Sequence, residues 1–95
     1  MDQARLLQVL KESAAYSKAM DMKGTRMVEE DFLPAEGKLA FHLKDVRLML
    51  ELGNRLNFPL ILSAAHAQAL ASQVSKGRGE WDNAAIIRFY KDLIE

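Results

Sequence analysis

Residues 38–58 constrain the fold of this chain most strongly, because their apolar side chains recur at the three- and four-residue spacing of a helix. Two neighbouring apolar rows are formed by Leu39, Leu43, Val46 and Leu50, and by Phe41, Leu48, Leu52 and Leu56. Two rows make a wide apolar arc, which is typical of a helix that is covered on most sides. We therefore expect one long central helix with the rest of the chain packed around it.

A narrow polar stripe remains on this helix, because residues three and four apart share one edge. The stripe consists of Lys44, Arg47, Glu51, Asn54 and Arg55. In one interpretation, i,i+4 pairs centred on Glu51 make a solvated edge, each pair contributing about 0.2–0.5 kcal/mol. In the other, Lys44 directs its ammonium group to a bound anion. Spacing alone favours the first interpretation and does not decide between them.

The residues before the central helix predict two shorter helical segments. Asp2 is a suitable N-cap for a first helix that ends or bends near residues 14–17. Residues 21–24 predict a break, with Gly24 just past a helix end. A short helical turn and an extended stretch then lead to Pro34.

After the central helix, which we expect Pro59 to end, the sequence predicts two more helices. Residues 60–76 form an Ala-rich helix that Gly77 stops, and Asp82 caps a last helix from residue 83 to about residue 93. Gly53 is either a tolerated weak spot in the central helix or a point where a neighbouring helix packs closely. No segment alternates with the period of a strand, so the predicted fold class is all-α, a small helical bundle.

The composition limits the possible partners. With 95 residues the chain makes one small domain, and 49% hydrophobic residues suffice for a core. Thirteen basic and 13 acidic residues leave no net charge, which argues against nucleic acid or an anionic membrane as partner. The absence of cysteine excludes disulfides, and neither a signal peptide nor a membrane-spanning run is present. We expect a soluble, cytoplasmic protein.

The residues alone do not make an active site. His42 and His66 fall on different predicted helices with no carboxylate at ligand spacing, so neither a metal site nor a catalytic residue is predicted. There is no glycine-rich phosphate loop and no Ser/His/Asp arrangement. Trp81 is interpreted as a packing anchor beside the last helix.

Four short motifs, in order, resemble those of the β-hydroxyacid dehydrogenase family. They are Met27-x-x-x-Asp31-Phe32-x-Pro34, Lys44-Asp45, Phe58-Pro59-Leu60 and Gly77-x-Gly79-x-x-Asp82-x-x-Ala85. The family includes the 3-hydroxyisobutyrate dehydrogenases and the 2-hydroxy-3-oxopropionate reductases. Its members have a Rossmann domain that binds NAD or NADP and a helical C-terminal domain like that of 6-phosphogluconate dehydrogenase. This chain is similar to the second domain.

The resemblance implies that residues 1–95 form a single C-terminal domain. The N-terminal Rossmann domain and the interdomain helix with the catalytic lysine would then lie outside this sequence, and the fragment alone would be inactive. Lys44 would contact the NAD or NADP cofactor, Asp45 would help to order the cleft wall, and Arg47, where the family has Gly, would add a second cation. Residues 35–37 lack the aromatic residue that often lines the family's substrate pocket.

The sequence therefore predicts the cleft-closing and dimerisation domain of an NAD(P)-dependent oxidoreductase acting on a β-hydroxyacid. Its partners would be its own Rossmann domain and further copies of itself in a homo-oligomer. The alternative is a free-standing helical interaction module without catalysis, in which Lys44 is only a surface residue. Apolar and Ala-rich helix faces fit both.

Overall fold

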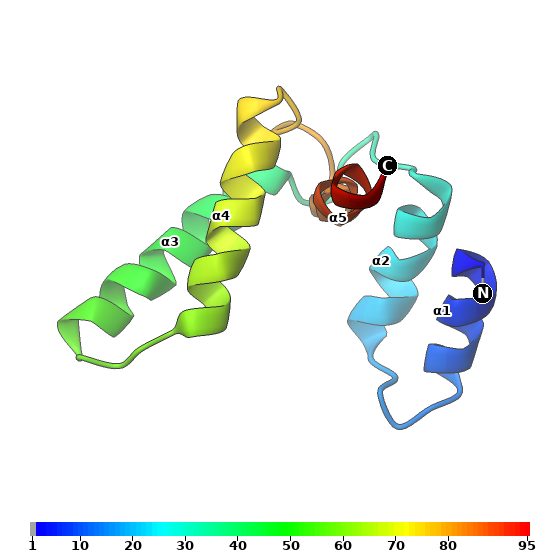
Figure 1. Cartoon of the computed structure of the whole chain (residues 1–95), viewed down its shortest axis with the longest axis horizontal. Helices are drawn as coiled ribbons and strands as arrows, with labels where there is room; N and C mark the ends of the chain where they lie inside the picture. Colours follow the sequence, from blue (N-terminus) through cyan, green and yellow to red (C-terminus); the bar gives the residue numbers. More distant parts are fainter. Residues whose placement is uncertain (1) are drawn as a thin grey trace.

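The computed structural model describes residues 2–95, and within this range the chain is helical, with a single isolated β-bridge between Lys38 and Asp82 (Figure 1). The elements are α1 (Gln3–Lys11), α2 (Lys18–Glu29), α3 (Leu39–Arg55), α4 (Ile61–Ser75), the 3-10 helix η1 (Asn83–Ile86) and α5 (Ile87–Ile94). The predicted all-α fold class is confirmed. None of the helices in this range is long and apolar enough to cross a membrane.

The helices form two hairpins, α1–α2 and α3–α4, which open away from each other, with η1 and α5 lying between them (Figure 1). The radius of gyration is 14.4 Å. A compact domain of this length has a radius of gyration of about 12 Å. The chain is therefore more open than an ordinary domain of its size.

The buried core lies at the junction of α3, α4 and η1. Its members are Phe32, Leu39, Leu43, Val46, Ala67, Ala69, Leu70, Ala84, Ala85 and Ile86. Phe32 stacks on Trp81 with ring centroids 5.6 Å apart, which confirms Trp81 as a packing anchor. Neither α1 nor α2 contributes a fully buried residue.

The expectation that α3 is covered on most sides is wrong. Leu39, Leu43 and Val46 of the first apolar row are buried, and Leu50 is half-buried. The second row is exposed, with 61% of Phe41 and 56% of Leu48 open to solvent. Helix α4 and η1 cover one side of α3, and no described element covers the side that carries the second row.

At the start of the chain, the predicted N-cap of the first helix is observed, but the predicted helix break at residues 21–24 is not. Asp2 caps α1 by accepting a hydrogen bond from the backbone N–H of Arg5 at 2.8 Å, as predicted. The predicted break at residues 21–24 is wrong, because α2 runs through Gly24 without interruption. A Cβ atom at Gly24 would lie 2.6 Å from Leu7 Cδ1. Gly24 therefore lets α1 approach α2, and it does not end a helix.

Gly53 marks a close contact between α3 and the turn that follows it. The helix ends at Arg55, before Pro59, and Asn57 reverses the chain with a left-handed φ of 55°. A Cβ atom on Gly53 would lie 2.9 Å from the backbone oxygen of Phe58 and 3.0 Å from Leu60 Cδ1. Close packing at Gly53 is therefore confirmed, but the close neighbour is the turn at residues 58–60 and not another helix.

We expect Gly53→Ala to lower the free energy of unfolding by about 1–3 kcal/mol, because the backbone at Phe58 cannot move aside. This loss outweighs the gain of about 1 kcal/mol that alanine brings to a helix interior. Gly24→Ala is the matched control, since the atom it meets is the tip of a flexible leucine side chain, and we expect a change within about 1 kcal/mol. Urea denaturation of both variants measures the difference, and equal effects would contradict the packing argument.

The carboxylate of Asp82, which is fully buried, joins η1 to α2. Its Oδ1 atom lies 2.9 Å from Lys23 Nζ and 3.0 Å from Arg26 Nη1. Lys23 also donates to Oδ2 at 3.1 Å. Both cations project from α2, so one buried charge ties this hairpin to the core.

The same carboxylate also organises the backbone around it. Its Oδ1 accepts from the N–H groups of Glu36 at 3.0 Å and Gly37 at 3.3 Å, and its Oδ2 accepts from Ala84 N–H at 2.9 Å. The predicted capping role is therefore confirmed. Burial would raise the pKa of Asp82, but the hydrogen bonds from Ala84, Lys23, Gly37 and Glu36 outweigh it and lower the pKa to about 2.

We expect Asp82→Asn to lower the free energy of unfolding by about 3 kcal/mol, because it leaves two cations facing an amide. The folded pKa lies below the ordinary value of 3.8, so the carboxylate stabilises the fold above pH 4 and loses this effect as the pH falls. The wild-type chain should therefore lose about 1 kcal/mol more than Asp82→Asn between about pH 5 and pH 3. Denaturant titrations at both pH values test this, and parallel pH profiles would contradict it.

Arg26 holds the loop between α2 and α3. Its guanidinium donates to the backbone oxygens of Asp31 at 2.7 Å and Pro34 at 2.6 Å, and to the carboxylate of Glu36 at 3.0 Å. One side chain therefore satisfies several polar groups of a segment that has no regular structure of its own.

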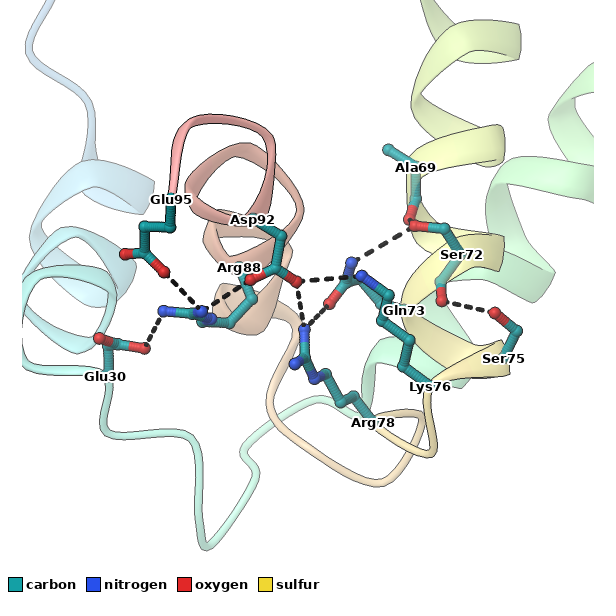
Figure 2. A network of polar contacts seen from close by, with 10 residues as sticks. All are labelled: Glu30, Ala69, Ser72, Gln73, Ser75, Lys76, Arg78, Arg88, Asp92 and Glu95. Atoms are coloured by element: carbon teal, nitrogen blue, oxygen red, sulfur yellow. Dashed lines mark hydrogen bonds and ion pairs between the residues drawn. The ribbon is translucent and has the colours of Figure 1, made fainter.

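A second polar network fixes α5 between the two hairpins (Figure 2). Asp92 accepts from Lys76 and Arg78, each at 3.1 Å, and from Arg88 at 2.7 Å. Arg88 also donates a hydrogen bond of 3.0 Å to the carboxylate of Glu30 at the end of α2. The hydrogen bonds from Lys76 and Arg78 lower the pKa of Asp92 to about 2. The end of α4, helix α5 and the end of α2 are thereby joined by charge-assisted contacts.

Candidate functional site

The outer face of α3 carries the residues that the sequence analysis selected for cofactor binding. Lys44, Asp45 and Arg47 are all exposed. Helical spacing places Lys44 between Phe41 and Leu48, which belong to the exposed apolar row. The face therefore combines apolar side chains with a central cation.

The charged side chains of this face make no ion pair with any residue in the described range 2–95. Neither Arg47–Glu51 nor Glu51–Arg55 approaches within 4.0 Å, and Lys44 has no such partner among residues 2–95. The internally paired edge that spacing allowed is thus not formed. In contrast, Arg78 and Arg88 are fully engaged in the network around Asp92.

These residues fit a dinucleotide by their chemistry. A pyrophosphate is a diffuse anion with many acceptor oxygens, and exposed ammonium and guanidinium groups without a carboxylate partner are free to donate to it. The adjacent residues Lys44 and Asp45 point about 100° apart around the helix axis, so they do not neutralise each other. The described face supplies cations and apolar surface.

The motif residues divide into two groups by what they do in the structure. Phe32 is buried in the core and Asp82 holds the backbone and the α2 cations. Lys44 and Asp45 do neither, since both are exposed and make no side-chain contact that holds the fold. Their presence is therefore not explained by the architecture of residues 2–95.

The structure brings together two side chains that the sequence analysis kept apart. His42 of α3 and His66 of α4 lie with their Nε2 atoms 3.1 Å apart, and their rings meet edge to face. Burial lowers the pKa of His66, and the neighbouring His42 lowers it further. A separation of 24 residues gives no spacing signal, so only the tertiary structure shows the pair.

The histidine pair faces a cavity of about 450 Å³ between the two hairpins. Its walls are mostly apolar and include Leu7, Leu10, Met20, Met27 and Ile86, with Lys23 and Asn83 among the polar residues. Among residues 2–95, no group of three or more His, Asp or Glu side chains converges on one point.

Comparison with known proteins identifies the family. Residues 1–90 match the family described as NAD-binding of NADP-dependent 3-hydroxyisobutyrate dehydrogenase. The chain therefore belongs to this family, and the predicted resemblance to the β-hydroxyacid dehydrogenases and to their NAD or NADP cofactor is confirmed at this level.

Two proteins illustrate the similarity. The uncharacterized oxidoreductase YfjR of Bacillus subtilis strain 168 is 37% identical over 68 residues, which are 72% of this chain and 24% of that protein. The crystal structure of 3-hydroxyisobutyrate dehydrogenase (ygbJ) from Salmonella typhimurium matches with a TM-score of 0.86 and 22% identity, over 93% of this chain. The chain spans only 30% of that structure's length. At 22% identity, this structural match shows only that the chain shares its fold with the corresponding part of that enzyme.

Proposed function

We propose that this chain forms the C-terminal helical domain of an NAD(P)-dependent dehydrogenase, in which the outer face of α3 lines the cofactor cleft. The observation that carries this proposal is the state of Lys44, which is exposed and unpaired within residues 2–95 although it belongs to a family motif. Membership of an NAD-binding family supports the assignment. The substrate would be a β-hydroxyacid or the corresponding semialdehyde.

Each charged residue of this face has a separate role in the proposal. Lys44 donates a charge-assisted hydrogen bond to a phosphate or ribose oxygen of the dinucleotide, and Arg47, almost one turn further along α3, adds a second cation. Asp45 accepts from donors on the opposite cleft wall and so helps to order it. The bound cofactor accepts or supplies the hydride.

The open shape of the chain supports a further domain as partner. The second apolar row of α3 is exposed, and the cavity between the hairpins has mostly apolar walls. Exposed apolar surface of this kind is typical of a face that another domain or subunit covers. In the complete enzyme, a nucleotide-binding Rossmann domain and a catalytic lysine would come from further residues, since this chain spans only 30% of the length of the Salmonella dehydrogenase structure. We expect the chain alone to show no turnover.

We expect Lys44→Ala, made in a dehydrogenase that carries this chain as its C-terminal domain, to raise the cofactor KM. The loss of a charge-assisted hydrogen bond lowers kcat/KM roughly tenfold to a hundredfold. Arg47→Ala should have a smaller effect. Steady-state kinetics with the cofactor as the varied substrate measures both.

Arg55→Ala is the matched control, since Arg55 is also exposed and unpaired but lies at the far end of α3. Its kinetics should equal those of the wild type, and thermal unfolding should show that all three variants are folded. An unchanged cofactor KM in Lys44→Ala would remove Lys44 from the cofactor site.

A second candidate function is self-association through the α3–α4 turn and the start of α4. Four large apolar residues are strongly exposed there: Leu56, Phe58, Ile61 and Leu62, with 85% of Leu62 accessible. Such a patch favours a protein interface. Self-association is compatible with the cofactor role, because Lys44 lies near the opposite end of α3.

We expect Ala64→Glu to shift this chain toward monomers, because the new carboxylate lies one turn from Ile61 on the exposed face of α4 and would be desolvated in an interface. Sedimentation velocity over a concentration series measures the change. Glu51→Gln on α3 is the control and should leave sedimentation unaltered. An Ala64→Glu variant with wild-type sedimentation would exclude this face as the interface.

A further inference from the structure

The sequence contains two histidines and no cysteine, and the structure places both histidines in contact. Imidazole and thiolate are the protein ligands that hold late first-row divalent metals most tightly. Among residues 2–95, His42 and His66 are therefore the side chains best suited to hold such an ion together. We infer that this pair binds one Cu²⁺ or Zn²⁺ ion, which bridges α3 and α4.

The distance between the two nitrogens fits a shared ion. Two imidazole nitrogens bound at about 2.0–2.1 Å lie roughly 2.9 Å apart in a square-planar site and roughly 3.4 Å apart in a tetrahedral one. The observed Nε2–Nε2 distance of 3.1 Å falls between these values. For a tetrahedral ion, each metal–nitrogen bond makes an angle of about 35° with the line that joins the two nitrogens. The imidazole rings would therefore need to tilt by a comparable angle to direct their lone pairs at the ion.

The surroundings of the pair leave space for the rest of a coordination sphere. The cavity of about 450 Å³ that the histidines face can hold an ion with its water ligands. The charged side chain among the residues that line it is Lys23, and its ammonium group is held by Asp82 at 2.9 Å. Among residues 2–95 no carboxylate lines this cavity, and its side-chain oxygens come from Ser17 and Asn83, so it is a poor site for Mg²⁺ or Ca²⁺, which prefer several oxygen ligands.

Each histidine must bind the ion as a neutral imidazole, through a ring nitrogen that carries no proton. In the metal-free chain one Nε2–H donates to the other Nε2 atom, so ion binding requires the donor ring to carry its proton on Nδ1 instead. Both Nε2 lone pairs then coordinate the ion. With two protein ligands and water in the remaining positions, affinity is lower than in a four-ligand site and follows the order Cu²⁺ above Zn²⁺.

The consequence for the fold is a cross-link in the α3–α4 hairpin. His42 lies in the first turn of α3 and His66 in the second turn of α4, so the ion would join two helices that the turn at residues 56–60 connects only at one end. An ion that binds the folded chain and not the unfolded chain raises Tm.

The test uses the untagged full chain, because a histidine tag would add ligands. Isothermal titration with CuCl₂ and ZnCl₂ at neutral pH should give one ion per chain, with Cu²⁺ tighter, and MgCl₂ should give no binding. With free ion about a hundredfold above Kd, thermal unfolding should shift upward by roughly 10 °C. At about pH 5, protons should compete and weaken binding.

His42→Gln and His66→Gln should each weaken binding at least tenfold, by removing one of the two ligands. Glu51→Gln, which removes an exposed carboxylate of α3, should bind as the wild type does. Electron paramagnetic resonance of the wild-type Cu²⁺ complex should show two nitrogen ligands, a readout that does not depend on the variants folding. No binding at millimolar ion, wild-type affinity in either histidine variant, or a single nitrogen ligand would each overturn the inference.

Discussion

The buried carboxylate of Asp82 is the interaction on which the arrangement of the two hairpins depends. Taking a charge out of water is costly unless partners replace the water, and here two α2 cations and three backbone N–H groups do so. These partners come from α2, from the loop before α3 and from η1. Because Asp82 also bridges to Lys38, it sets the position at which α3 begins.

The hydrophobic core contributes little to the placement of the first hairpin. The buried apolar residues belong to α3, α4, η1 and Phe32, whereas α1 packs mainly against α2. Polar contacts from Lys23, Arg26 and Glu30 therefore carry the connection between the hairpins. Directional contacts of this kind fix an orientation but cover little apolar surface, which is why the cavity between the hairpins stays open.

The sequence predicts the helical class and most helix ends well, because periodicity and capping act over a few residues. It fails where the answer depends on distant neighbours. Gly24 looks like a helix end by local preference, but the contact with Leu7 of α1 explains it. The second row of α3 looks buried by periodicity, but its covering is not among residues 2–95.

In the candidate site, too, some residues could be predicted from the sequence and others could not. Lys44, Asp45 and Arg47 can be found from the sequence because a resemblance places them, and the structure adds that their charges are not used internally. The pairing of His42 with His66 has no counterpart in the sequence pattern. It arises from the antiparallel packing of α3 on α4, which no local rule specifies to the level of individual side chains.

The contacts of Arg26 have a consequence for where the chain tolerates insertions. The guanidinium donates hydrogen bonds to two carbonyl oxygens and one carboxylate within residues 31–36, so these positions must keep a fixed spacing from α2. A one-residue deletion or insertion there would move at least one acceptor out of reach. The connection between α1 and α2 is exposed, and its contacts are with residues close by in the sequence, such as the hydrogen bond from Ser13 to the backbone oxygen of Leu10. A peptide label or a fluorescent probe therefore belongs in residues 13–16, where added length leaves the start of α3 undisturbed.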